Sequence, residues 1–518
     1  MTLTRVTTTI RPGHYMLGFL RRHYLSIDPR TLGLLRIAIA CLLLVDLVKR
    51  VPVLRLFYVN AGLIPNHRVL WRPPREHMVS LLLAFGEVGE VQIAFVLIAL
   101  VYLCLLIGYR TRLMHVLAWL SLVSLQTRAD VLSSGADFVF STMVLWSAFL
   151  PLGRRFSVDA VLDREAPNNQ PVVSLAVLAL TVQLAVIYFF NTVHKDGPTW
   201  REGTAVYWLV HQERIVTWLG YWARESLPLW AFQALTYVTL VVEGALPLLI
   251  LSPWGRPWTR RIALLSIFGL HTGMALMSNL GLFSPVMMVY ALCFVETSDW
   301  EWWARSRLRA RPAVQRAIAA CHRSSVRAVE LFGLQRTAAA PSVRRACYWL
   351  GELTVLALIM LAISQVLVEN RAIPAPLRIE QPRFVRGAIE YLRLNQGWSM
   401  FAPDAPMSDL FVVIDAVTSD GRHIDPWNDR ASRISDPSLR TIPARLDQDA
   451  AYCDYSSRVV DDDILHEPLR DWIFNHHRRT HRPEDRIEHF KAYAIEQDNP
   501  APGERAPSNV RSRVFLRY

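Results

Sequence analysis

Nine apolar runs follow one another along this chain, each long enough or nearly long enough to cross a lipid bilayer. A helix needs about 20 apolar residues to span about 30 Å of hydrocarbon. The runs lie at 32–48, 88–107, 113–127, 137–152, 172–193, 229–251, 262–278, 280–296 and 347–368. They predict an all-α polytopic membrane bundle of about nine transmembrane helices.

Composition supports the same class of protein. The chain is 52% hydrophobic and only 19% charged, whereas a soluble domain carries about 25% charged residues. Its formal charge is +12, and in an apolar chain a basic excess is typical of cytoplasmic loops. The sequence has no basic stripe with interleaved aromatics and no Cys/His finger spacing, so no nucleic-acid partner is expected.

Basic residues also predict the orientation, because cytoplasmic loops are enriched in Arg and Lys. The most basic connection, 301–345, is expected in the cytoplasm together with the N-terminus, 1–30. The transmembrane domain then covers 31–300, the last helix covers 346–369, and 370–518 forms an extracytoplasmic domain. We expect a multi-pass protein of the bacterial inner membrane.

The region after the last span changes character and is expected to be rich in β-structure. Residues 410–417 read as a strand, 419–422 as a turn, and 487–495 as a second strand. Cys453 is the only cysteine of this region, so no disulfide within it is expected. The chain has no CxxC or other metal-ligand spacing, and no metal site is predicted.

Ionisable residues inside spans are costly and are therefore candidates for function. Asp137 opens the fourth span, Glu243 lies in the sixth and His271 in the seventh. Arg36 and Asp46, in the first span, are expected to pair with neighbouring helices.

Lys195 lies at the outer end of the fifth span and has two opposing interpretations. Only three of the 56 basic residues are lysines, and Lys can release its proton whereas Arg cannot. Lys195 and Asn191 are four residues apart and share a helix face. Against a functional role, a lysine near a span end often only reaches toward the lipid headgroups. Beyond it, Trp200, Tyr207, Trp208 and Trp218 predict an interfacial segment.

Several motifs occur in an order that resembles a known family. They are DPRTLGLLRI (28–37), LIGYRTR (106–112), SSGADFVF (133–140), FLPLGRRFSVDAVL (149–162), YFFNTVHKDGPTW (188–200) and HTGMALMSNLGLFSPVMM (271–288). Over about residues 25–300 the chain resembles the HTTM (horizontally transferred transmembrane) domain family, which includes vitamin K-dependent gamma-carboxylase. The run GWSMFAPDAP (397–406) also resembles the segment after the last span in bacterial members.

The resemblance implies a chemistry and a catalytic residue. The family's catalytic base is a lysine with tryptophan five residues on, which matches Lys195 and Trp200. It would deprotonate a reduced naphthoquinone of the vitamin K or menaquinol type, which reacts with O2 and supports addition of CO2 to a glutamate. The resemblance implies that Glu243 and His271 belong to this site. The scarcity of lysine and the Trp200 spacing predict that Asn191 lines the same cavity, and Asp137 is a further candidate. A lipid quinol and an exported protein substrate are the implied partners, besides the bilayer, and no metal is implied.

The chain departs from the carboxylase at the start of the fourth span. The carboxylase has a catalytic histidine preceded by asparagines there, whereas this chain has Ser133-Ser-Gly-Ala-Asp137. Quinol epoxidation is therefore expected to be easier to detect than carboxylation. Two other functions stay open: a catalytically silent membrane scaffold or a maturation or immunity factor for an exported partner, and a transporter. A transporter is less favoured because no inverted repeat or pair of broken helices is visible.

Overall fold

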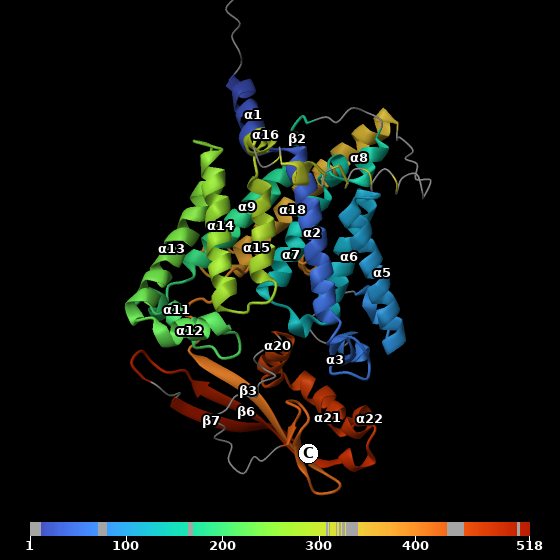
Figure 1. The fold of residues 1–518 in the computed structure, drawn as a ribbon, viewed down its shortest axis with the longest axis vertical. Helices are drawn as coiled ribbons and strands as arrows, with labels where there is room; N and C mark the ends of the chain where they lie inside the picture. The colour runs from blue at the N-terminus through green and yellow to red at the C-terminus, as the bar shows by residue number, and fades with distance from the viewer. Residues whose placement is uncertain are drawn as a thin grey trace, which may run out of the picture.

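The computed structural model describes residues 12–70, 80–163, 169–306, 340–431, 450–504 and 508–518, with a few positions between 309 and 327. Its helices form a bundle with a β-sheet unit at one end, and α1 (Pro12–His23) lies at the opposite end (Figure 1). About half of the predicted basic loop 301–345 lies outside the described residues.

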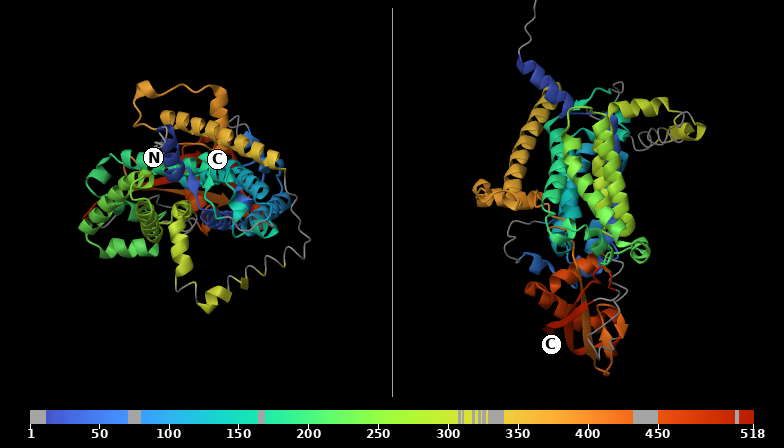
Figure 2. Two further views of the ribbon diagram at one scale, coloured as in Figure 1. Left: turned by 90° about the horizontal axis from the view of Figure 1, so that it is seen from above. Right: turned by 90° about the vertical axis from the view of Figure 1, so that its left-hand side faces the viewer.

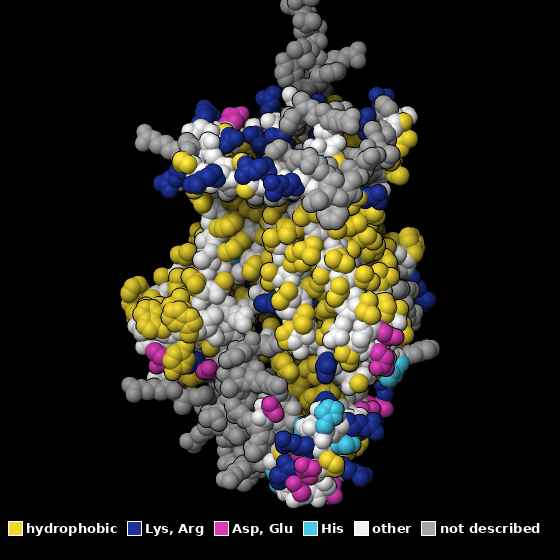
Figure 3. All heavy atoms as spheres, turned by 45° about the vertical axis from the view of Figure 1, so that its right-hand side comes forward, with side chains coloured by type: hydrophobic (Ala, Val, Ile, Leu, Met, Phe, Trp, Pro, Cys, Tyr) yellow, Lys and Arg dark blue, Asp and Glu magenta, His cyan; other side chains and the backbone are white. Residues whose placement is uncertain are grey.

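Five helices are long and apolar enough to cross a membrane: α2 (Pro29–Arg50), α5 (Val88–Ile107), α9 (Leu175–Val193), α13 (Leu229–Leu251) and α18 (Pro341–Glu369). Between 19 and 29 residues long, they rise by about 1.5 Å per residue and match the thickness of the hydrocarbon core. The chain is therefore an integral membrane protein. On the face drawn in Figure 3, apolar side chains cover the middle of the bundle, and basic side chains gather at the end away from the sheet.

The other four predicted spans correspond to helices that are shorter or more polar. They are α6 (Thr111–Arg128), α7 (Gly135–Ala148), α14 (Trp258–Met277) and α15 (Phe283–Ala291). These helices run beside the five long ones (Figure 1) and pack against them, α7 and α15 on each other and α14 on α13. Nine spans stays a prediction, because within the described part of the chain five helices meet the length and hydropathy expected of a span.

Helix α9 is the most enclosed of the long helices, and α18 is the least. Helix α9 packs on α13, α7 and α18. Helix α18 packs on α9 and exposes Leu353, Met360 and Ile363. Figure 2 shows it at the edge of the bundle. The candidate site residue Asn191 of α9 is therefore held in the bundle interior.

The two buried charged residues of the first span, Arg36 and Asp46, have different kinds of hydrogen-bond partner. Arg36 donates to the carbonyl of Leu105 at 2.6 Å and to that of Phe156, so it satisfies the free end of α5. Asp46 accepts two hydrogen bonds from Arg50, each 2.9 Å long, on its own helix rather than a neighbouring one. Both residues thus have a structural role.

The C-terminal region forms an antiparallel five-stranded sheet in the order β5-β4-β3-β6-β7. Its strands are β3 (Ser408–Thr418), β4 (His423–Asp425), β5 (Arg430–Ala431), β6 (Ile487–Asp498) and β7 (Ser508–Arg517). The two predicted strands are confirmed as β3 and β6, and Gly421 forms the predicted turn at φ 81°. Trp427, Tyr455 and Ile473 fill the core of this unit.

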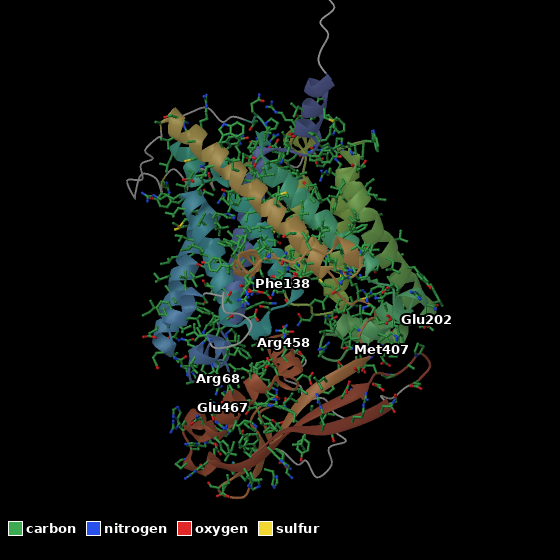
Figure 4. The ribbon with its side chains drawn as sticks, turned by 180° about the vertical axis from the view of Figure 1, so that it is seen from behind. Arg68, Phe138, Glu202, Met407, Arg458 and Glu467 are labelled. Carbon is green, nitrogen blue, oxygen red and sulfur yellow. The ribbon has the colours of Figure 1, made fainter. Side chains whose placement is uncertain are left out.

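Helices join the sheet to the bundle. They are α20 (Ala450–Val459), α21 (His466–Phe474) and α22 (His476–Thr480). Helix α20 contacts both β3 and the short helix η2 (Asp130–Leu132) of the bundle. Arg458 of α20 donates to the carbonyl of Ser133 at 2.6 Å, and Arg68 pairs with Glu467 (Figure 4). The sheet unit is therefore tied to the bundle by charged hydrogen bonds.

Candidate functional site

Lys195 is held at the end of α9 by local structure. Ser174 caps the start of the helix by accepting from the backbone N–H of Ala176 at 3.1 Å. Val193 is the last helical residue, and Pro198 begins the short helix α10 (Pro198–Arg201). Lys195 lies in the turn between them and is 8% exposed. It does not reach out to the headgroups, because its side chain is directed into the protein.

Lys195 forms a buried ion pair with Glu243 of α13. Its Nζ contacts Glu243 Oε2, and the two side chains are 3% and 4% exposed. Asn191 Nδ2 donates to both carboxylate oxygens of Glu243 at 3.2 Å. This fixes the amide orientation, since a carboxylate only accepts. The carboxylate thus holds Asn191 of α9 and Lys195, which lies two residues beyond the end of that helix.

Trp200 provides the second contact of the ammonium. Lys195 Nζ lies 4.3 Å from the centroid of the Trp200 ring, which is the geometry of a cation–π interaction. The indole Nε1 donates to the carbonyl of Phe401 at 2.8 Å, so the ring is fixed in place. The spacing of five residues between Lys195 and Trp200 therefore brings the indole ring against the ammonium group.

His271 forms a second polar group of the site together with Tyr188. The Tyr188 hydroxyl lies 2.9 Å from His271 Nε2, and the Phe283 ring lies edge-on to the imidazole with centroids 5.4 Å apart. If the tyrosine donates, both groups of this contact are satisfied and the proton of the imidazole lies on Nδ1. His271 Nδ1 and Asn191 Oδ1 are buried and have no hydrogen-bond partner among the described residues.

These two polar groups border one cavity. It is lined by Ile187, Tyr188, Asn191, Lys195, Glu243, His271, Met274, Phe283, Met287, Met400 and Phe401. The empty space between these side chains is about 310 Å³, a volume that includes open solvent at its mouth. The structure therefore brings together Lys195, Asn191, Glu243 and His271.

A strap, residues 397–406, covers this cavity and comes from the chain between α18 and β3. Met400 and Phe401 of the strap line the cavity. Asp404 accepts from the backbone N–H and the hydroxyl of Thr199, at 2.8 and 2.9 Å. Gly197 N–H donates to the carbonyl of Pro403 at 3.0 Å. The run that resembles bacterial family members is thus the roof of the site.

Asp137 is not among the residues that line the cavity. Its carboxylate accepts from the backbone N–H of Ser134 at 2.8 Å and so caps α7. It also pairs with Arg50 at 3.2 Å. The start of α7 nevertheless approaches the strap, since a Cβ on Gly135 would lie 3.0 Å from Met400 Sδ.

The expected interfacial segment is only partly interfacial. Trp200 and Tyr207 are 2% and 8% exposed, whereas Trp218 is 81% exposed. Trp200 packs beneath the strap with Ala205 and Ala405, and Tyr207 packs on Phe232 of α13. The prediction was wrong for these two residues because the chain folds back under the strap before it reaches the surface.

Together, the bundle and its buried Lys–Glu pair beside a roofed cavity define a helical membrane protein with an internal polar site. The HTTM domain model matches residues 24–300, and the chain belongs to this family. The chain is similar to a Bacillus subtilis (strain 168) protein called "Uncharacterized protein YitO", with 26% identity over 199 residues. The match covers 37% of this chain and 63% of that protein, less than two thirds of its length. No solved structure matches.

Proposed function

We propose that the cavity binds a lipid-soluble quinol and that Lys195 removes a proton from its ring hydroxyl. The observation that carries this proposal is the buried pair of Lys195 and Glu243 at the wall of the cavity. Buried ionisable groups inside a membrane protein are expensive, and they mark functional sites more often than they add stability.

The pair gives Lys195 a route to the uncharged state that a general base needs. Glu243 contacts Lys195 directly, so it is placed to accept the proton that Lys195 must lose before it acts as a base. Asn191 then holds the carboxyl group through its amide. An arginine in the same place would keep its proton and could not act as a base.

The remaining polar atoms of the cavity fit a ring that carries oxygen atoms. Asn191 Oδ1 is an acceptor for a hydroxyl group, and His271 Nδ1–H is a donor for a hydroxyl or carbonyl oxygen. Ile187, Met274 and Met287 offer apolar contacts to the ring. When bound, a reduced naphthoquinone of the vitamin K or menaquinol type supplies an acidic hydroxyl and, with O2, the reducing equivalents for oxygenation. With CO2, the same chemistry extends to carboxylation of an exported protein.

Orientation is part of the proposal. The connections after α5, α7 and α13 carry Arg110 and Arg112, Arg154 and Arg155, and Arg256, at the end of the bundle away from the sheet. The positive-inside rule places these arginines in the cytoplasm. The sheet unit and the strap then lie outside, in a bacterial inner membrane with nine spans, where an exported partner would meet the roof of the cavity.

The test is quinol turnover by the full chain in nanodiscs, with a reduced 2-methyl-1,4-naphthoquinone that carries a short isoprenoid tail. Lys195→Arg keeps the charge but not the base, so we expect epoxide formation to fall by about 10²–10⁴-fold. Lys49→Arg changes an exposed lysine of the same bundle and is the matched control. Equal turnover of wild type and Lys195→Arg, with equal thermal melts, would remove the general-base role.

A catalytically silent scaffold for an exported partner is the second candidate. It is favoured by the position of Asp137, which caps α7 and pairs with Arg50. The site where the carboxylase has its histidine is thus occupied by a structural residue. No turnover of several quinols by wild-type protein, together with absent quinol binding, would favour this function.

A further inference from the structure

Helix α12 (Trp218–Ser226) presents an aromatic face that no other part of the described chain covers. Trp218, Tyr221 and Trp222 are 81%, 50% and 55% exposed. They are three and four residues apart, so they lie on one side of the helix. Gly220 and Ala223 lie on the buried side.

The helix is fixed to the end of α14 on its buried side. Thr217 N–H donates to the carbonyl of Met277 at 3.1 Å, and Val216 pairs with Ser278 in a β-bridge. A Cβ on Gly220 would lie 2.3 Å from the Met277 carbonyl oxygen, so only glycine permits this approach. The direction of the aromatic face is therefore fixed.

The aromatic face is continuous with the lipid-facing surface of the bundle. Helix α13 begins three residues after α12, and Trp230, Val238, Val241 and Leu248 along it are 69%, 57%, 70% and 76% exposed. A 23-residue helix is about 35 Å long, slightly more than the hydrocarbon core. Trp254, 81% exposed, follows its other end. Tryptophans thus bracket α13 at the two depths where bilayers favour them.

The polar side of α12 carries charges suited to the headgroup region. Arg224 pairs with Glu213 at 2.7 Å and stacks on the ring of Tyr221, with 4.5 Å between Cζ and the centroid. A patch that binds a protein partner would end at a sharp border. The aromatic patch of α12 instead merges into the lipid-facing side of α13. The bilayer is therefore the occupant that the surface fits.

We infer that α12 lies in the plane of the membrane interface, on the side of the C-terminal sheet, with Trp218, Tyr221 and Trp222 among the acyl chain ends of the headgroup boundary. The turn before α12 also holds the strap and the sheet. Gln212 Nε2 donates to the Pro406 carbonyl at 2.8 Å, and Glu213 N–H donates to Asp409 Oδ2 at 3.0 Å. The helix thus sets the height of the cavity roof above the bilayer.

The experiment measures depth with fluorescent labels on single cysteines in nanodiscs, after replacement of the six native cysteines. A label at Trp222→Cys is expected to be quenched by lipids with a nitroxide near the top of the acyl chain and only weakly by iodide in water. Val241→Cys, at mid-helix of α13, is the deep control, quenched best by a nitroxide near the chain end. Ser419→Cys, in the exposed turn of the sheet, is the aqueous control, quenched by iodide alone.

A label at position 222 that behaves like the one at 419 would overturn the inference, and so would one shielded from both lipid and iodide, which indicates a protein partner. A second measurement keeps the native cysteines. In vesicles of dibrominated phosphatidylcholine, wild-type protein is expected to lose more tryptophan fluorescence than Trp218→Phe/Trp222→Phe. Equal fractional quenching of the two proteins would also contradict the interfacial position.

Discussion

Lys195 and Glu243 are 48 residues apart in the sequence and form an ion pair whose side chains are 3% and 4% exposed. Each residue compensates the charge of the other in a region with little water. Removal of either partner destabilises the protein, because the remaining charge stays buried. This relationship leads to the first prediction.

Glu243→Gln is expected to destabilise the protein by about 3–5 kcal/mol, the cost of leaving one buried charge without its partner. Lys195→Met combined with Glu243→Gln should recover most of this loss, because neither charge remains. Thermal melts and denaturant unfolding in detergent give the two values as a double-mutant cycle. If the stability losses of the two single variants add up to the loss of the double variant, the two residues do not interact in the membrane.

Asp404→Ala is expected to loosen the strap. Two hydrogen bonds from Thr199 to this carboxylate are lost, and bonds to a charged group contribute about 1.5–3 kcal/mol. Gly197→Ala should have a similar effect by another route, since its Cβ would lie 2.3 Å from the Asp404 carboxylate. Hydrogen exchange of residues 197–205 measures the loosening. Asp420→Ala, in an exposed turn, is the control and should leave this exchange unchanged.

Tyr188→Phe is expected to weaken quinol binding with a modest effect on stability. The change removes the hydrogen-bond partner of His271 Nε2. The unsatisfied nitrogen lowers the free energy of unfolding by about 1–3 kcal/mol. It also frees the imidazole to place its proton on either nitrogen, so Nδ1–H is no longer the fixed donor. Titration of the protein with a reduced naphthoquinone measures the affinity. Unchanged affinity in the variant would separate His271 from ligand binding.

The sheet unit is expected to be more stable in mild acid than at neutral pH. Burial raises the pKa of Asp409 to about 6 and that of Asp425 to about 6, against an ordinary value of 3.8 for each. The folded state therefore binds these protons more tightly, and their contribution is complete below about pH 4 and is lost as the pH rises through about 6.

Burial lowers the pKa of His476, and this shift changes the stability with pH in the opposite direction. The measurement is therefore a comparison of variants. Asp409→Asn keeps an acceptor for the Glu213 N–H and removes one titrating group. Its melting temperature should fall less between pH 5 and pH 7 than that of wild type. Parallel curves would show that Asp409 is ionised in the folded protein throughout this range.

The orientation is tested by single-cysteine labelling of intact cells. Ser419→Cys, in the sheet, is expected to react with an impermeant maleimide, and Arg154→Cys is expected to react only after the membrane is permeabilised. Both positions are exposed in the structure, so lack of access to water does not explain a negative result. The reverse pattern would place the sheet in the cytoplasm.

Local patterns predicted the parts of this protein that depend on neighbouring residues. Hydropathy gave the helices, and the four-residue spacing of Asn191 and Lys195 placed both beside Glu243. Tyr188 lies three residues before Asn191 on the same face of α9, and this spacing was a usable signal for a further residue of the site. Ser134 and Asp137 have the spacing of a capping box, which accounts for the structural position of Asp137.

Contacts between segments that are distant in the sequence could not be predicted from local sequence patterns. Thr199 and Asp404 are 205 residues apart, and no periodicity relates the strap to the cavity that it covers. Trp200 and Tyr207 have the composition of an interfacial segment but are buried. Aromatic residues serve equally well in a core, and the tertiary contacts of the strap decide between the two.

The roof of the cavity is also the part of the site that the ribosome makes late. Asp404 emerges 205 residues after Thr199, and at about 5–20 residues per second this delay is roughly 10–40 s. Lys195 of this site is made before the delay begins and Glu243 of α13 is made early in it, so both members of the ion pair precede Asp404. A membrane-dissolved molecule therefore has a route to the lysine during biosynthesis that requires no detachment of Asp404 from Thr199. A ligand acquired in this way would be built into the protein rather than exchanged with each turnover.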